Sequence, residues 1–219
     1  MASKDTTKAI YFLLQGTFCI YYWNSILNLN AYFVENFDDI NIPKIYTTGY
    51  FIFTVFSFYM TLYIDKHFNI YKFIRGTFII ATILFNLIYF LCQFVPNGPV
   101  KKVVFFLFMM SLGVNAQILN NLTSGLCSRF EDKDIQRHFI GVAFSGLFTN
   151  GIMFVDLLGS RSTDNSMIYR LFLVIGDVLF VLFMLLQTRF FNLCKQNAYR
   201  MRKPSVVLSG KLSSRGHWD

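Results

Sequence analysis

The stretch AIYFLLQGTFCIYYWNSILNLNAYFV, from Ala9 to Val34, has 26 residues and no charged side chain. The hydrocarbon layer of a bilayer is about 30 Å thick, and about 20 helical residues are needed to cross it. This stretch is therefore long enough to span a membrane with some tilt. Because lipid offers no hydrogen-bond partners to the backbone, we expect each such span to be a helix.

Further apolar stretches of comparable length follow, and together they predict an all-α, polytopic membrane protein with six transmembrane helices. The expected spans are 9–34, 46–64, 76–95, 103–127, 139–158 and 168–187, in one bundle over 1–191. The remaining residues, 192–219, are basic and rich in Ser and Gly near their end, so we expect a disordered cytoplasmic tail.

Composition and charge point to the same class of protein. Of the 219 residues, 54% are hydrophobic and only 15% are charged, whereas a soluble domain carries nearer a quarter. The net charge of +8 does not indicate nucleic-acid binding, because the basic residues lie between and after the apolar spans. Fifteen Lys and Arg residues fall on the side of both termini and five on the other. The positive-inside rule then predicts cytoplasmic termini, and we expect a plasma-membrane location.

The sequence offers no recognisable catalytic or metal-binding motif. Cysteines and histidines are scattered without metal-ligand or disulfide spacing, and the spans hold no paired catalytic Ser, His and Asp. We therefore expect no metal, no cofactor and no enzymatic activity. The residues concerned are Cys19, Cys92, Cys127, Cys194, His67, His138 and His217.

Polar side chains gather on one face of the fourth span. Gln117, Asn120, Asn121 and Ser124 follow one another at i, i+3, i+4 and i+7, so all four lie within an arc of about 100°. Such a face does not suit lipid. Two interpretations remain open, namely hydrogen bonds between helices and the polar lining of a substrate cavity.

The first span carries Trp23 and Asn24 near its middle, although tryptophan is usual at the membrane interface. Trp23 and Gln117 are each about the fifteenth residue of spans that cross in opposite directions. Both therefore lie near the midplane, where secondary transporters bind substrate. An indole beside amides suits a planar, hydrogen-bonding ligand such as a nucleobase. The alternative is a packing tryptophan with an amide neighbour bonded to protein.

Two further features of the spans predict contacts between helices. Gly141, Ser145 and Thr149 recur at intervals of four, a spacing that lets helices approach closely. Asp177 lies near the middle of the sixth span, two helical turns from Arg170 and without an obvious partner. We expect it to pair with another helix, and the alternative is a role in proton or ion binding.

Two segments resemble a known family. WNSILNLNAYF, from Trp23 to Phe33, is similar to the first helix of equilibrative nucleoside transporters, where a Trp-Asn pair is followed at the same spacing by Tyr-Phe. SLGVNAQILNNLTSGL, from Ser111 to Leu126, resembles their fourth helix. In that segment Gly113, Gln117 and Gly125 keep the family's spacing. The family commonly carries proline where this chain has Tyr22.

The resemblance implies the N-terminal six-helix half of a major-facilitator-like transporter, which moves nucleosides or nucleobases by alternating access. It maps substrate contacts onto Trp23, Asn24, Leu27 and Gln117. Trp23 would stack on the base and Gln117 would bond to its edge. The polar face of the fourth span adds Asn121 as a candidate.

Members of that family have eleven helices, and six are expected here. The chain would then be a fragment, a half that pairs with another chain or with a second copy, or a relic without transport. The expected partners are a nucleoside or nucleobase, the lipid bilayer and such a second half, with no nucleic acid. The alternative function is a six-helix channel or structural membrane protein.

Overall fold

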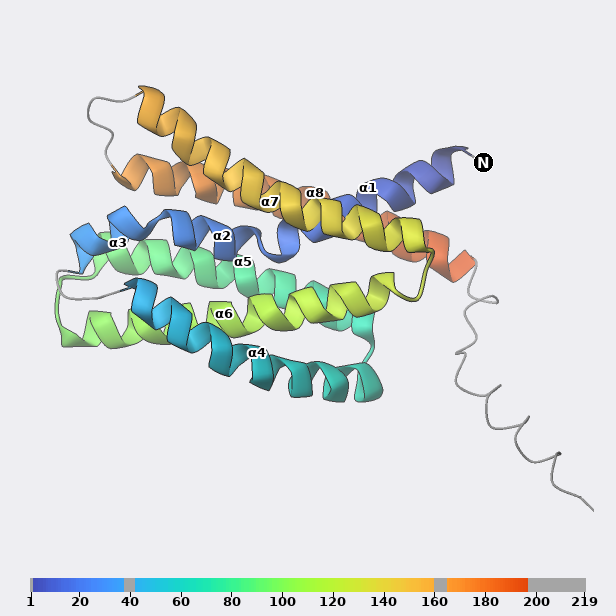
Figure 1. Ribbon diagram of the computed structural model, residues 1–219, viewed down its shortest axis with the longest axis horizontal. Coiled ribbons are helices and arrows are strands. Elements are labelled where there is room, and N and C mark those ends of the chain that lie inside the picture. The colour runs from blue at the N-terminus through green and yellow to red at the C-terminus, as the bar shows by residue number, and fades with distance from the viewer. Residues whose placement is uncertain (1, 38–41, 160–164, 197–219) are drawn as a thin grey trace, which may run out of the picture.

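A computed structural model of the protein describes residues 2–37, 42–159 and 165–196, and there every regular element is a helix (Figure 1). The predicted all-α class is therefore confirmed. The helices are α1 (Ala2–Cys19), α2 (Tyr21–Asn28), α3 (Asn30–Asn36), α4 (Ile42–His67), α5 (Ile70–Phe94), α6 (Pro99–Cys127), α7 (Asp132–Gly159) and α8 (Asn165–Gln196).

The helices lie side by side along the long axis of an elongated bundle (Figure 1). α1, α2 and α3 follow one another along a single rod, and the chain then runs back and forth through the others. The N-terminus, the α4–α5 turn, the α6–α7 turn and the end of α8 lie at one end of the bundle. We call this the N-terminal end. The α5–α6 turn lies at the opposite end.

The first predicted span, 9–34, is not one continuous helix. It is interrupted at Ile20 (φ −120°, ψ 5°) and at Leu29 (φ −86°, ψ 15°). Backbone hydrogen bonds bridge both interruptions, from Asn24 N to Ile20 O at 2.9 Å and from Phe33 N to Leu29 O at 3.1 Å. The rod therefore changes its winding at two points without ending there.

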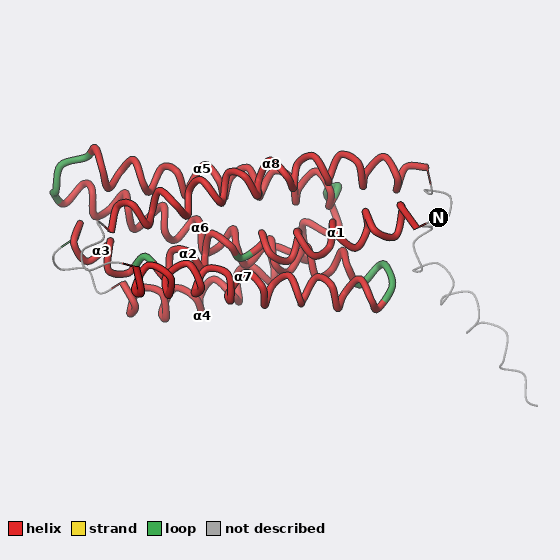
Figure 2. The backbone as a smooth tube through the Cα atoms, turned by 90° about the horizontal axis from the view of Figure 1, so that it is seen from above, coloured by secondary structure: helices red, strands yellow, loops and turns green. Residues whose placement is uncertain are grey.

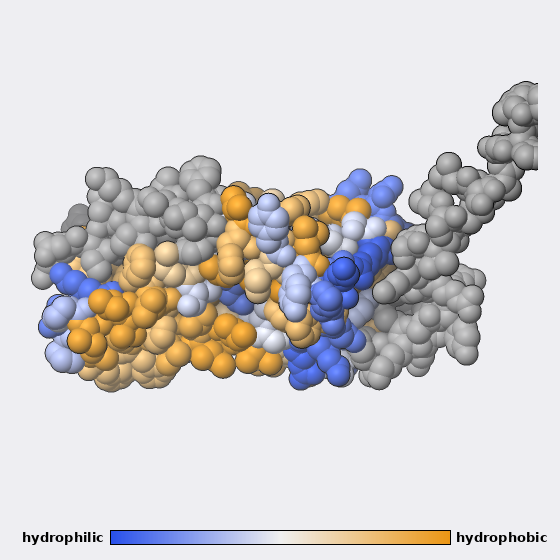
Figure 3. All heavy atoms as spheres, turned by 90° about the horizontal axis from the view of Figure 1, so that it is seen from below, coloured by the Kyte–Doolittle hydropathy of each residue, from blue (hydrophilic) through white to orange (hydrophobic). Residues whose placement is uncertain are grey.

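Three helices are long and apolar enough to cross a membrane, counting only the described residues. They are Ile70–Phe94, Pro99–Cys127 and Ser166–Phe190, with mean hydropathies of 2.0, 1.7 and 2.3. They correspond to the third, fourth and sixth predicted spans and indicate a membrane protein. On one face of the molecule, apolar residues cover a broad band and hydrophilic residues lie toward the ends (Figure 3).

Aromatic side chains fill the interior between the helices. Tyr11 stacks on Phe190 with ring centroids 4.1 Å apart, and Phe18 stacks on Phe78 at 4.7 Å. These contacts join α1 to α8 and to α5. α8 itself continues to Gln196, past the expected end of the bundle at 191. The rest of the predicted tail, 197–219, and the loop 160–164 lie outside the described residues.

Candidate functional site

The predicted substrate residues lie on α2 and α6, which run antiparallel and are in contact. The Cys19 thiol, at the end of α1, donates to Asn120 Oδ1 of α6 at 3.8 Å. Trp23 is one helical turn after Cys19, and Gln117 is about one turn before Asn120. Since the two helices are antiparallel, this contact sets Trp23 and Gln117 at the same level of the bundle.

The three candidates on α2 have different surroundings. Trp23 is half-buried and packs against the aromatic interior. Asn24 donates its amide to Ser145 Oγ of α7 at 3.2 Å, so this amide joins two helices. Leu27 is 43% exposed and lies on the outer surface of the bundle. The structure thus assigns Asn24 a protein partner and leaves Leu27 open to a ligand or to another chain.

The polar face of α6 divides into two pairs. Asn120 accepts from Cys19, and Ser124 Oγ lies 3.3 Å from His138 Nε2 of α7, so both serve contacts between helices. Gln117 and Asn121 are half-buried, and neither side chain has a hydrogen bond to the described part of the chain. These two amides have unused donors and acceptors in a helix that is long and apolar enough to cross a membrane.

The position of α7 beside this site depends on glycine. A Cβ at Gly141 would overlap the carbonyl oxygen of Leu13 and lie 2.8 Å from Thr17 N. A Cβ at Gly16 would overlap the carbonyl oxygen of His138. The backbones of α1 and α7 therefore touch, which confirms the close packing expected at Gly141. The same helix spacing brings Ser145 within reach of Asn24.

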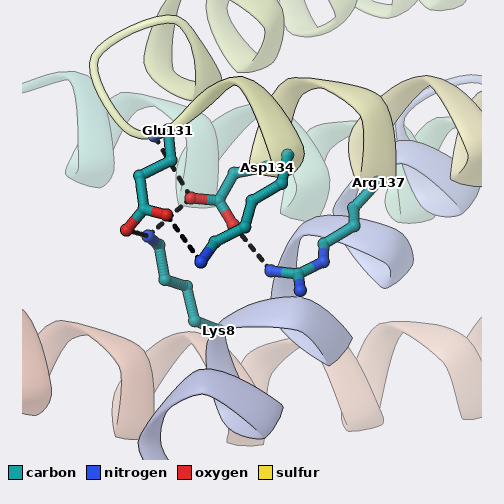
Figure 4. A network of polar contacts seen from close by, with 5 residues as sticks. Lys8, Glu131, Asp134 and Arg137 are labelled. Atoms are coloured by element: carbon teal, nitrogen blue, oxygen red, sulfur yellow. Dashed lines mark hydrogen bonds and ion pairs between the residues drawn. The ribbon is translucent and has the colours of Figure 1, made fainter.

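Charged residues fix the same two helices to each other at the N-terminal end (Figure 4). The fully buried carboxylate of Asp134 lies 2.5 Å from Lys8 Nζ and accepts from Arg137 at 2.9 Å. Glu131 pairs with Lys133 at 2.6 Å and with Lys8 at 3.4 Å. The hydrogen bond from Lys133 and the charge of Lys8 hold the pKa of Glu131 below its usual value.

The sequence prediction treated Lys8 and Arg137 only as topology signals and missed this network. The spacing of Asp134 and Arg137 at i and i+3 was a usable signal for part of it. Lys8 could not be assigned, because 123 residues separate it from Glu131. The network holds the first turns of α7 in place and so supports the glycine contact further along the helices.

A groove of about 300 Å³ lies at the start of α5, away from the predicted site. It extends from Phe68 to Ile80 and includes Lys72 and Gly76. None of the five predicted substrate residues lines it.

No protein-family model and no curated protein matches this chain. The features that bear on its function are therefore the bundle itself and the resemblance carried by residues of the first and fourth predicted spans.

Proposed function

We propose that this protein is one half of a facilitative transporter that carries nucleosides or nucleobases by alternating access. The observation that carries the proposal is the pair of unbonded amides on α6, with Gln117 at the level of Trp23 and Asn121 one helical turn further along, at the level of Cys19. Amides in lipid need a partner, a ligand or water. A base could stack on the indole of Trp23 and bond to these amides.

In this proposal the α1–α3 rod and the five longer helices are six transmembrane spans, arranged as in the N-terminal half of a major-facilitator-like fold. α4 and α7 lie on one side of the bundle and α5 and α8 on the other (Figure 2). α6 packs against both α4 and α5, and α2 contacts α7, where Asn24 is bonded to Ser145; we assign the substrate to the α4–α7 side. The large apolar side chains exposed on that side include Phe56, Tyr59, Phe144 and Leu147. A second transporter half would cover them.

Each candidate has a distinct role in the proposed site. Trp23 supplies the stacking surface, an interaction of about 1–3 kcal/mol per base. Gln117 and Asn121 each offer a carbonyl oxygen and an amide nitrogen, which match the alternating acceptors and donors on the edge of a base. Leu27 forms an apolar wall, while Asn24 holds α2 against α7 through Ser145.

The proposed orientation places both termini in the cytoplasm, and the proposed location is the plasma membrane. Several exposed basic residues at the N-terminal end support the orientation, because positive charge is enriched on the cytoplasmic side. They are Lys66, Lys72, Arg75 and Arg129.

Uptake of adenosine and inosine into proteoliposomes that contain the full chain, together with any partner half, tests the proposal. We expect Trp23→Ala and Gln117→Ala each to lower uptake at least about tenfold, the equivalent of one lost stacking contact or hydrogen bond. Gln136→Ala, at an exposed glutamine, is the matched control and should retain uptake. Full uptake by both site variants would exclude the assigned site. Ion currents without nucleoside counterflow would favour the six-helix channel instead.

A further inference from the structure

Asp177 lies halfway along a membrane-spanning helix. It is the twelfth of the 25 apolar-span residues from Ser166 to Phe190 of α8. At a rise of 1.5 Å per residue, the carboxylate is about 17 Å from one end of the span and about 20 Å from the other. Charged side chains at this depth are rare and almost always face a partner or a water-filled cavity.

The partner that the structure gives Asp177 is a neutral amide. Asn86 Nδ2 of α5 donates to Asp177 Oδ1 at 3.3 Å and also to the carbonyl oxygen of Thr82 at 3.0 Å. Arg170, two turns away on α8, donates instead to Tyr89 Oη at 2.8 Å. Among the described residues, no Lys or Arg forms an ion pair with Asp177. The amide therefore orients the carboxylate without neutralising its charge.

The tyrosines beside Asp177 do not supply a further donor. Tyr21 and Tyr22 pack on Gly176, the preceding residue of α8. The Tyr21 hydroxyl donates to the carbonyl oxygen of Phe172 at 2.9 Å, and the Tyr22 hydroxyl donates to Thr82 Oγ1 at 3.0 Å. Both hydroxyl protons are used inside the bundle, so the second carboxylate oxygen of Asp177 needs a donor from elsewhere.

The side chain of Asp177 is exposed, and the residues around it are apolar and exposed as well. We define the α5–α8 face as Asp177 with its apolar neighbours on the two helices. These neighbours are Val174, Val178 and Val181 on α8 and Ile83, Leu87 and Phe90 on α5. Acyl chains suit the apolar residues of this face but offer no hydrogen-bond donor to the carboxylate.

We propose that the α5–α8 face binds a transmembrane helix of another protein, which brings a Lys or Arg side chain to Asp177 at the middle of the bilayer. The charge and the unused oxygen of Asp177 call for a cationic donor, and the six apolar neighbours give the helix a packing surface. A second copy fits less well. A two-fold axis along the membrane normal would set its Asp177 at the same depth, where two like charges repel.

This face is distinct from the proposed substrate side. α5 and α8 lie on one side of the bundle, and α4 and α7 lie on the other (Figure 2). The inference therefore does not depend on nucleoside transport, and either proposal can fail without the other.

Synthetic single-span peptides of Leu and Ala test the proposal, with Lys, Leu or Glu at the central position. The full chain and one peptide are labelled, reconstituted together in phosphatidylcholine vesicles and compared by resonance energy transfer. We expect the Lys peptide to bind about tenfold more tightly than the Leu peptide. Asp177→Asn should remove this difference, and the control Asp132→Asn, at an exposed acid outside the span, should preserve it.

Exchange of the charges gives a second, independent measurement. The Asp177→Lys variant should no longer bind the Lys peptide and should bind the Glu peptide instead. Thermal unfolding checks that the variant is folded. If that variant does not fold, Asp177→Asn alone decides. Equal binding of the Lys and Leu peptides to the wild type would overturn the proposal, since the face would then simply meet lipid. Energy transfer between two copies of the chain that Asp177→Asn abolishes would also overturn it, in favour of self-association.

Discussion

Two helix pairs in this bundle are held together by opposite means. In the middle of the α1–α7 contact, Gly16 and Gly141 carry no side chain and the two backbones touch. Where α5 meets α8, polar side chains reach across, as in the bonds from Tyr169 Oη to the Phe85 carbonyl oxygen at 3.0 Å and from Asn86 to Asp177. The first pair should tolerate no added volume, and the second should lose stability in small steps as single hydrogen bonds are removed.

The largest effect is expected from Gly141→Ala. The new methyl group would overlap the carbonyl oxygen of Leu13, so α1 and α7 must move apart. We expect a loss of about 3 kcal/mol in the free energy of unfolding. Gly151→Ala on the same helix is the control, because nothing lies within 4 Å of the added atom. Thermal unfolding in detergent measures both, and equal stability of the two variants would show that the helices do not touch.

A smaller loss is expected from Asp134→Asn, at the end of the same helix pair. The change removes the negative charge that pairs with Lys8 and Arg137. We expect a loss of about 2 kcal/mol in the free energy of unfolding. Asp132→Asn, an exposed acid in the same turn, should change stability little. Denaturant titration of the reconstituted chain measures the free energy of unfolding of both variants. If Asp134→Asn left the free energy of unfolding unchanged, the glycine contact would be the interaction that joins α1 to α7.

On the other helix pair, Tyr169→Phe removes the hydrogen bond from the hydroxyl on α8 to the Phe85 carbonyl oxygen on α5. The Phe85 carbonyl belongs to a helix, so we expect a loss of only about 1 kcal/mol. Tyr59→Phe, at a tyrosine that is 68% exposed, is the matched control. A loss as large as that of Gly141→Ala, measured by the same thermal unfolding, would remove the contrast between the two pairs.

The smallest effect concerns the pH dependence of the ion network. Since the pKa of Glu131 is lowered in the folded protein, its ionised form stabilises the fold above the usual pKa of 4.5. This contribution is lost as the pH falls through the lower, folded-state pKa. The melting temperature of Glu131→Gln should therefore vary less with pH in this acidic range than that of the wild type. Parallel curves for the two proteins would assign the acid sensitivity to other carboxylates.

The helical class and the close packing at Gly141 could be predicted from the sequence, because each depends on local composition or spacing. The interruptions at Ile20 and Leu29 could not be predicted, since neither position holds proline or glycine. The pairing of Asp177 with Asn86 was also beyond reach, because 91 residues separate the two side chains.

The candidate site was predictable only in part. The amide face of α6 could be identified from its helical spacing, but not its division into bonded and unbonded residues. That division depends on which helices lie beside each turn of α6: Asn120 meets the end of α1 and Ser124 meets α7. Whether Gln117 and Asn121 meet a ligand stays a prediction.

The contact between α1 and α7 can form only late in the synthesis of the chain. Glu131 is made 123 residues after Lys8, and ribosomes add about 5–20 residues per second. For roughly 6–25 seconds the newly made α1 lacks the helix against which its glycine packs. Completion of the bundle must therefore wait until α7 has been made, and in a chain arrested before that point Lys8 lacks its acidic partners Glu131 and Asp134.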